Sequence, residues 1–275
     1  MKTAEKMKII HDIHIHTNLS FCAAHDATLE KYVQQAKGGQ LKVLGISNHL
    51  WDSDVPGASQ WYVPQNVDHV LQLKKLFPSN REIEGIKILF GCETEFTYEG
   101  KLCITEEHMA LFDYILVPHS HTHIKVVMPQ EYAGDHSVHA RFLMDSFMRV
   151  VTHRLSRHFT AIAHPFFPGT NHNICNTVQA LIPNSYFYEA FAAAREADVA
   201  IEINGSCLPK NEIPNCEYVR IYSIAKECGC RFTYGSDSHD HRVDRKLHLV
   251  EFFCDQCGIT QEDFLSVKDL VAKIK

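Results

Sequence analysis

The sequence predicts an α/β barrel built around a parallel sheet, and three observations favour it. The chain has 275 residues, a length that suits one such barrel, and 45% hydrophobic residues are enough for a full core. Short apolar, β-branched runs alternate with helix-like stretches, as in repeated strand–helix units. Seven of these apolar runs end in His, Asp, Glu or Asn. We therefore expect a single barrel domain over residues 1–275.

The strands and helices follow from this alternation. Each expected strand is a short apolar run bounded by polar residues or turn formers, and the helices lie between such runs. Strands are expected at residues 8–15, 42–47, 86–91, 114–117, 160–163, 199–203 and 231–235. Helices are expected at residues 29–37, 66–77, 136–155, 214–227 and 261–273. The stretch "TYEGKLCI" (97–104) predicts a small hairpin with Glu99 and Gly100 at its turn.

Composition narrows the function classes. The formal net charge is −6 and the isoelectric point is near 6.3, which does not favour a nucleic-acid or anionic-membrane partner. The N-terminal stretch has no apolar signal-peptide core, and no run approaches the roughly 18–20 apolar residues of a membrane span. We expect a cytoplasmic protein whose ten scattered cysteines are reduced. Its nineteen histidines are an unusually large number.

Many of these polar side chains follow the expected strands directly. In chain order the strand ends read "HDIHIHT", "SNH", "GCETE", "PHSHTH", "AHP", "EINGS" and "GSDSH". In a parallel barrel the carboxyl ends of the strands meet on one face, where such folds build their active sites. This pattern predicts a shared metal site on that face.

Spacing indicates which side chains share the site. His14 and His16 are two residues apart, so on a strand they point to the same face, and Asp237 and His239 are related in the same way. Glu93 and Glu95 would share a face if their strand continues, and Glu93, nearer the strand end, is the better candidate for a carboxylate that bridges two ions. His49 and His164 add two more strand-end candidates. A set of His, Glu and Asp suits two or three divalent ions such as zinc, manganese or iron.

Such a site lowers the pKa of bound water to near neutrality, and it stabilises both the attacking and the leaving oxygen of a displacement reaction. The chemistry that this favours is ester hydrolysis, most naturally of phosphate esters.

The motifs "HDIHIHT", "SNH", "GCETE", "AHP" and "GSDSH", in that order, resemble the polymerase and histidinol phosphatase (PHP) superfamily. The resemblance runs from about residue 8 to about residue 265. It implies a distorted (β/α)7 TIM-like barrel, with two or three divalent metal ions at the carboxyl ends of the strands.

The resemblance also implies a ligand set. His14, His16 and Asp237 would bind a first ion, and Glu93 would bridge it to a second. His164 and one histidine of "PHSHTH" would complete the second ion's ligands; His121 is favoured and His119 is the alternative. A third ion would be bound by His49, His239 and His25, with Asp26 as the substitute for His25.

The implied activity is hydrolysis of a small-molecule phosphate monoester by a metal-bridging hydroxide, with release of phosphate and with histidinol phosphate as one candidate substrate. Glu93, Asp237 and His239 are the expected catalytic residues, and Lys210 and Arg242 are candidates for gripping the phosphate. The alternatives are a PHP-type nuclease, another metallohydrolase, or a metal-binding domain without catalysis.

One position departs from the family pattern. The second motif usually reads Thr-Asp-His, whereas here it reads Ser47-Asn48-His49. The amide keeps the shape of the carboxylate but not its charge, so metal affinity or the pH optimum is expected to differ.

Overall fold

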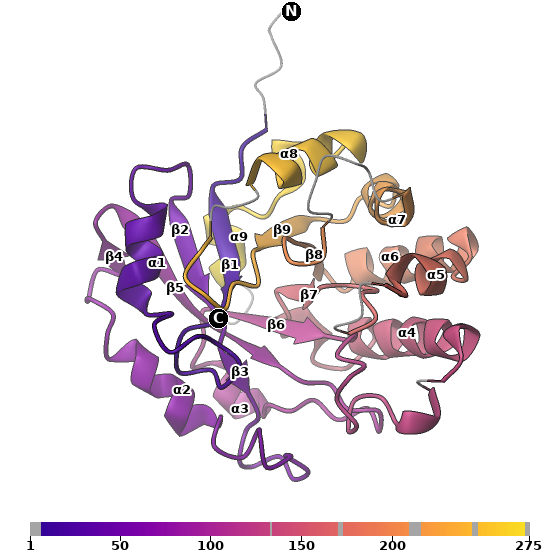
Figure 1. The fold of residues 1–275 in the computed structure, drawn as a ribbon, viewed down its shortest axis with the longest axis horizontal. Coiled ribbons are helices and arrows are strands. Elements are labelled where there is room, and N and C mark those ends of the chain that lie inside the picture. Colours follow the sequence, from indigo (N-terminus) through magenta and orange to yellow (C-terminus); the bar gives the residue numbers. More distant parts are fainter. Residues whose placement is uncertain (1–6, 133, 170–172, 209–215, 244–246, 273–275) are drawn as a thin grey trace, which may run out of the picture.

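The computed structural model of the chain describes residues 7–132, 134–169, 173–208, 216–243 and 247–272. Its centre is a parallel sheet in the order β1-β2-β5-β6-β7-β8-β9, which curls into a nearly closed seven-stranded barrel (Figure 1). The strands are β1 (His11–Ile15), β2 (Val43–Ile46), β5 (Ile86–Thr94), β6 (Tyr114–Pro118), β7 (Ala161–Ala163), β8 (Ala200–Asn204) and β9 (Phe232–Gly235). Two short strands, β3 (His49–Leu50) and β4 (Glu82–Ile83), pair with β5. The predicted fold class is confirmed, and each of the seven expected strands is present within a few residues.

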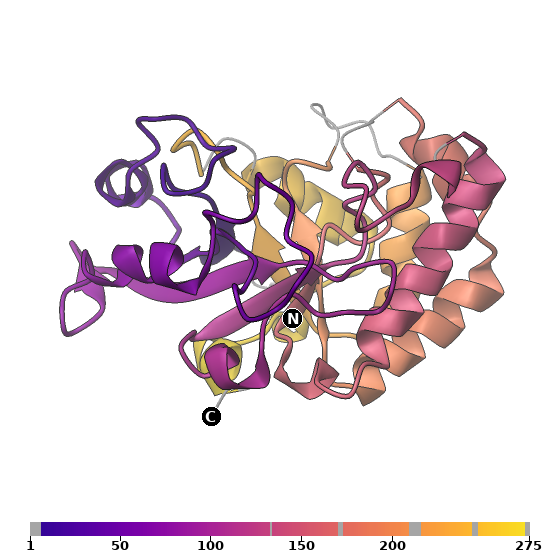
Figure 2. The same cartoon turned by 90° about the horizontal axis from the view of Figure 1, so that it is seen from below.

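Helices cover the outside of the barrel. Figures 1 and 2 show α4–α7 packed side by side along β6–β9, with α1 and α2 on the other flank. The helices are α1 (Leu29–Ala36), α2 (Val67–Lys74), α3 (Glu106–Met109), α4 (His136–Val151), α5 (Cys175–Ala180), α6 (Asn184–Glu196), α7 (Cys216–Glu227), α8 (Leu247–Gln256) and α9 (Val267–Ala272). None of the helices in the described ranges is both long and apolar enough to cross a membrane.

The helix expected at residues 261–273 is divided in two. A 3-10 turn spans Gln261–Asp263, and α9 begins only at Val267. Between them the chain is extended, because Phe264 forms a parallel bridge to Phe232 and the Leu265 N–H donates to the Phe232 carbonyl. Helices α3, α5, α6 and α8 are additional to those expected. The turn of the expected hairpin is present, with a bridge between Phe96 and Leu102.

The barrel closes between its first and last strands at the carboxyl end. The Asp237 N–H donates to the His14 carbonyl at 2.8 Å, and the His16 N–H donates to the Ser238 carbonyl at 3.0 Å. Lower down, a side chain replaces the backbone ladder, since Asp12 Oδ1 accepts the Ser236 N–H at 2.9 Å. The seam therefore ties the two motifs "HIH" and "GSDSH" directly together.

The interior below the site is apolar. The Tyr114 ring fills it and packs so closely on Gly91 that a Cβ there would lie 2.2 Å from Tyr114 Cζ. The same ring leaves no room for a side chain at Gly45, where a Cβ would lie 2.5 Å from the phenol oxygen. Because the barrel is filled from below, water and ligands can approach the polar strand ends only from the carboxyl face.

Candidate metal centre

Four side chains converge at the carboxyl end of β1, and we call them the inner group: His14, His16, Glu93 and Asp237. His14 lies in β1 and His16 directly follows it; Glu93 lies in β5 and Asp237 two residues beyond β9. The side chains of His14, His16 and Glu93 are at most 1% exposed and that of Asp237 is 19% exposed. The resemblance to the PHP superfamily implied this set of four, and the structure brings their side chains together.

The distances within the inner group resemble those between the ligands of one ion. His14 Nε2 lies 3.1 Å from His16 Nε2, 3.4 Å from Glu93 Oε2 and 3.6 Å from Asp237 Oδ1. His16 Nε2 lies 3.5 Å from both of these oxygens. Ligand atoms that bind a tetrahedral zinc ion at 2.0–2.1 Å are about 3.3 Å apart. Five of the six edges of such a tetrahedron are thus present within a few tenths of an ångström.

The second carboxylate oxygen of Glu93 faces two further imidazoles. Glu93 Oε1 lies 2.9 Å from His164 Nε2 and 3.6 Å from His121 Nε2. His164 directly follows β7, and His121 lies three residues beyond the end of β6. Glu93 therefore has one oxygen directed at each of two sets of nitrogens, as expected of a bridging carboxylate.

Hydrogen bonds fix the tautomers of these imidazoles. The Ser120 hydroxyl donates to the His164 carbonyl at 2.8 Å, so its oxygen accepts from His164 Nδ1, also at 2.8 Å. His164 Nε2 lies 2.9 Å from Glu93 Oε1, within hydrogen-bond distance. In the tautomer with the proton on Nδ1, Nε2 carries the lone pair and can bind a cation beside that oxygen. The residues present thus fit a divalent ion.

Two buried carboxylates support the ligands from behind. Glu202 Oε1 accepts from His14 Nδ1 at 2.7 Å, and its Oε2 accepts the backbone N–H of His164 at 2.6 Å. Glu95 Oε1 accepts from His121 Nδ1 at 2.7 Å and from the Tyr62 hydroxyl at 2.5 Å. Such partners set the tautomer and orientation of a ligating imidazole. Sequence reasoning placed Glu95 on the same face as Glu93 but gave it no role. It did not single out Glu202, although Glu202 lies on β8 two residues before the strand-end Asn204.

The carboxylates and imidazoles of the site shift each other's pKa values. Burial disfavours the charged form of His14, but Glu202, Glu93 and Asp237 outweigh it and raise its pKa well above the ordinary value. Burial would raise the pKa of Glu93, yet the imidazoles of His14, His121 and His49 hold it well below the usual range. The pKa of Asp237 is likewise lowered, against burial, chiefly by His14. Both carboxylates are therefore available as anionic ligands.

The backbone at two candidate ligands is strained. His164 has φ of 30° and Asp237 has φ of 54°, a region that non-glycine residues rarely occupy. Each lies just past a strand end and is fixed by hydrogen bonds, the His164 N–H to Glu202 and the Asp237 N–H to the His14 carbonyl. Outliers of this kind concentrate at sites where the surrounding fold determines the side-chain direction.

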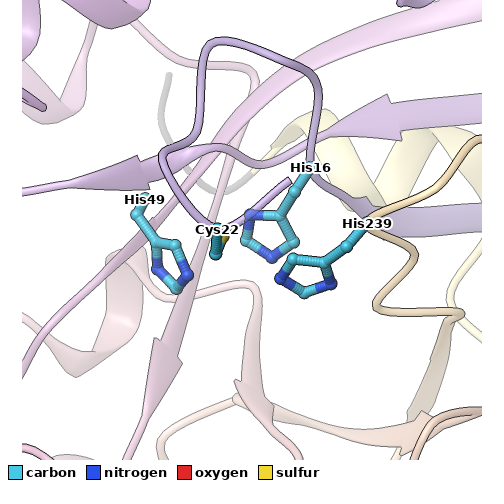
Figure 3. A group of neighbouring side chains, drawn as sticks. All are labelled: His16, Cys22, His49 and His239. Atoms are coloured by element: carbon cyan, nitrogen blue, oxygen red, sulfur yellow. The ribbon is translucent and has the colours of Figure 1, made fainter. Parts of the chain in front are cut away.

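A second cluster lies nearer the pocket mouth, and we call it the outer group: Cys22, His49 and His239 (Figure 3). Together with His16, each offers a ligand atom within 4.8 Å of the others. His49 Nδ1 also lies 3.1 Å from Glu93 Oε2, without hydrogen-bond geometry. Cys22 comes from the loop between β1 and α1 and was not anticipated. The loop was expected to supply His25 or Asp26.

His25 and Asp26 do not join the cluster. Both are exposed, and Asp26 pairs with Lys31 at 2.5 Å instead. The loop forms a turn in which the Ala23 N–H donates to the Ser20 carbonyl at 3.1 Å, and the Ala24 N–H donates to the His239 carbonyl at 2.7 Å. This turn directs Cys22, rather than the residues after it, toward His49 and His239.

Three further predicted site residues are His119, Arg242 and Lys210. His119 is fully buried but faces away: its Nε2 accepts the Phe166 N–H at 2.8 Å and its ring packs on Phe147. Of the two alternatives, the structure thus brings His121 and not His119 to Glu93. Arg242 is exposed and pairs with Asp240, outside the pocket lining. Lys210 lies outside the described residues.

Asn48 connects two of the candidate motifs. Its Oδ1 accepts the Thr17 N–H at 2.8 Å, and its Nδ2 donates to Thr17 Oγ1 at 2.9 Å. The amide thus fixes the residue that follows His16 to the residue that precedes His49. It has a structural role here that uses both a donor and an acceptor, which a carboxylate would fill differently.

A pocket of about 580 Å³ opens above both groups, within the range of small-ligand sites. Glu93, His121, His164 and Asp237 lie at its floor and the outer group beside them. Its walls include four large apolar side chains: Trp61, Tyr62, Ile124 and Phe167. Among the described residues that line it, none is Lys or Arg. The pocket combines a polar, anion-rich floor with apolar walls.

Comparison with known proteins identifies the family of the chain. The PHP domain model matches residues 12–206, which is more than half of the chain. The chain belongs to the PHP domain family. The model's range takes in every candidate ligand described above except Asp237 and His239.

Curated relatives match most of the chain at low identity. A protein of Caldicellulosiruptor bescii named "Probable phosphatase" is 27% identical over 83% of this chain and 79% of its own length. Another of that name, from Vibrio campbellii, is 26% identical over 92% of this chain and 86% of its own.

Among solved structures, the chain is similar to histidinol phosphate phosphatase from Lactococcus lactis, crystallised with zinc, L-histidinol and phosphate. The TM-score is 0.64 at 18% identity, and the match covers 98% of each chain. At this identity the likeness supports the PHP fold.

Proposed function

We propose that this PHP protein is a metal-dependent phosphatase that hydrolyses a small-molecule phosphate monoester. The observation that carries the proposal is the inner group, in which five distances between imidazole nitrogens and carboxylate oxygens match the spacing of one ion's ligands. The side chains of His14, His16 and Glu93 in this set are at most 1% exposed. Its arrangement at the floor of an open pocket favours a catalytic role over a purely structural one.

Two ions would share Glu93. His14, His16 and Asp237 would hold the first together with Glu93 Oε2, and His164 and His121 would hold the second with Glu93 Oε1. Nitrogen and carboxylate ligands of this kind suit zinc, manganese or iron. When bound, such ions supply a nucleophile at neutral pH and neutralise charge on a phosphoryl group.

The protein's own residues would orient this chemistry and bind the substrate. Glu202 and Glu95 hold the imidazoles of His14 and His121 in the tautomer whose Nε2 faces the site. Because no lysine or arginine lies among the described lining residues, the phosphate charge would be balanced by the ions. Trp61 and Phe167 would then contact the organic part of the ester.

The substrate we favour is a compact monoester, with histidinol phosphate the first to be tested. Support comes from the pocket volume of about 580 Å³ and from the related fold that was crystallised with L-histidinol and phosphate. The named relatives agree with phosphatase activity in general. A nuclease is disfavoured because a nucleic-acid backbone requires basic side chains, and the described lining has none.

The test combines metal analysis with an ester panel. The purified protein should contain at least two ions of zinc, manganese or iron per chain. It should release phosphate from histidinol phosphate or p-nitrophenyl phosphate, and not cleave bis(p-nitrophenyl) phosphate or single-stranded DNA at a comparable rate. A His16→Ala variant should lose metal and activity together while its circular dichroism is unchanged, and Glu82→Gln, an exposed change, should alter none of these.

Two results would contradict the proposal. One is fewer than two ions per chain and no turnover of any monoester after zinc, manganese or iron is added. The other is a His16→Ala variant that hydrolyses esters at the normal rate.

A further inference from the structure

Among the described residues, Cys22 is the one cysteine that belongs to a candidate metal-ligand group. Figure 3 shows Cys22 between the imidazoles of His49 and His16, with His239 beyond His16. One ligand atom from each of these four residues lies within 4.8 Å of the others. Sulfur differs from every other donor of the centre, because it is soft and binds zinc far better than it binds manganese.

The backbone around Cys22 is tied to the segments that carry the other two members of the outer group. The Ser20 hydroxyl oxygen accepts the His49 N–H at 3.1 Å. The Ala24 N–H donates to the His239 carbonyl at 2.7 Å. The loop is therefore fixed on both sides of the cysteine, so the position of its sulfur relative to His49 and His239 is determined by the fold.

Both imidazoles of the outer group offer a nitrogen without a hydrogen-bond partner. His239 Nδ1 donates to the Asp237 carbonyl at 2.8 Å, which leaves Nε2 with its lone pair. His49 is only 8% exposed, and its Nδ1 is buried with no hydrogen bond. A buried nitrogen without a partner is costly, and a metal ion is one way to satisfy it.

We propose that Cys22, as a thiolate, ligates an outer divalent ion together with His49 and His239, and that this position selects zinc over manganese. The inference rests on the metal centre proposed above and adds a ligand and a selectivity to it. On binding, the thiol proton is released to solvent and a sulfur–metal bond forms, without any change of oxidation state. The inner group, built only from nitrogen and oxygen donors, has no such preference for a thiophilic ion.

Cys207 provides a matched control. It lines the same pocket, so its thiol is close to the centre, but it is not a member of any of the candidate ligand groups. Its sulfur lies 3.8 Å from the Ser206 hydroxyl instead. A signal that depends on Cys22 and not on Cys207 therefore reports ligation and not simple proximity to the pocket.

The experiment is cobalt substitution of the metal-free protein, followed by absorption spectroscopy. Cobalt(II) bound by a thiolate gives a charge-transfer band in the near ultraviolet that nitrogen and oxygen ligands do not give. We expect this band in the wild-type protein and in Cys207→Ala, and its loss in Cys22→Ser. In competition titrations, Cys22→Ser should also bind its last zinc ion at least about 100-fold more weakly, since loss of a mere supporting partner already costs 10- to 100-fold. Manganese affinity should change little.

The outcomes separate this inference from the proposed function. If cobalt binds and monoesters are hydrolysed but the wild-type protein shows no charge-transfer band, Cys22 is not a ligand and the phosphatase proposal stands. If Cys207→Ala loses the band and Cys22→Ser keeps it, the assignment to Cys22 is overturned. If no cobalt binds at all, both proposals fail. Cys22 is exposed at the pocket mouth, so the serine variant is expected to fold normally.

Discussion

The inner and outer groups lie side by side but are held in place differently. The ligand candidates of the inner group are supported by the strand ladder and by a buried carboxylate, Glu202, which contacts both His14 and the His164 backbone. The outer group depends on a loop. Cys22 is exposed and the His239 side chain is 35% exposed. Two hydrogen bonds join the loop to the backbone of His49 and of His239. The outer group thus joins one strand residue, His49 of β3, to a loop cysteine and to His239 beyond β9.

This difference has a functional consequence. A ligand set within ordered strands loses little conformational entropy when it binds an ion, so it should bind tightly and hold the reacting groups precisely. A set completed by a loop should bind more weakly and exchange its ion more readily. We therefore expect changes in and behind the inner group to cost more activity than changes near the outer group.

The largest effect is expected for Glu93→Gln. Glu93 would be shared by the two inner ions, because its two oxygens face His14 and His16 on one side and His164 on the other. An amide cannot serve both sides as an anionic ligand. Monoester hydrolysis should fall at least about 100-fold and at least one ion should be lost. Metal analysis and kcat for p-nitrophenyl phosphate would check this, and a variant with full metal content and normal kcat would rule out the bridging role.

The next effect is expected for Glu202→Gln, which touches no candidate ion. With the amide nitrogen toward His14, that imidazole would take the other tautomer, with a proton on the Nε2 that faces the site. With the nitrogen on the other side, it would face two donors, the His164 N–H and Asn204 Nδ2. Either arrangement should weaken metal binding about 10- to 100-fold. Zinc affinity by competition with a chelator measures this; unchanged affinity would mean that the inner group is set by the strands alone.

The same difference explains which residues of the site could be predicted from the sequence. His14, His16, Glu93, His164 and Asp237 could be predicted because strand alternation and the convergence of parallel strand ends fix where they point. Cys22 could not, because the direction of a loop residue depends on a few tertiary hydrogen bonds, such as that from Ala24 to His239. His121 and His119 both follow β6, and only the packing of His119 on Phe147 and its bond from Phe166 separate them. Glu202 was missed because its role depends on contacts across the barrel.

A smaller effect is expected at Asn48, between the two groups. In Asn48→Asp the carboxylate can still accept the Thr17 N–H, and the Thr17 hydroxyl can turn to donate to it, so metal affinity should change by less than about tenfold. Asn48→Leu removes both bonds and leaves a buried N–H without a partner, which should lower the free energy of unfolding by about 1–3 kcal/mol. Urea denaturation and zinc titration of both variants would test this. If Asp proved as damaging as Leu, the neutral charge of Asn48 and not its hydrogen bonding would be what the site requires.

The smallest effect, on stability alone, is expected behind the outer group. Buried Asp52, just beyond β3, accepts from His108 Nδ1 at 2.6 Å and from the Thr105 N–H at 3.1 Å, which ties the segment after His49 to α3. The hydrogen bond to Asp52 raises the pKa of His108, and hydrogen bonds from Asp54, His108 and Thr105 lower the pKa of Asp52 against its burial.

The two shifts define a pH window. A raised His108 pKa gives stability that is complete below the unfolded value of about 6.5 and is lost as the pH rises through the folded value. A lowered Asp52 pKa gives stability that is present above about 3.9 and is lost as the pH falls through its folded value. The charged pair therefore contributes most between about pH 4 and 6.5.

His108→Gln, which keeps a neutral donor, should lower the free energy of unfolding by about 1 kcal/mol at pH 5.5 and by almost nothing at pH 9, as measured by urea denaturation. His248→Gln, exposed on α8, is the matched control. Equal losses at both pH values would show that packing, and not the charge of the pair, links α3 to the segment after His49.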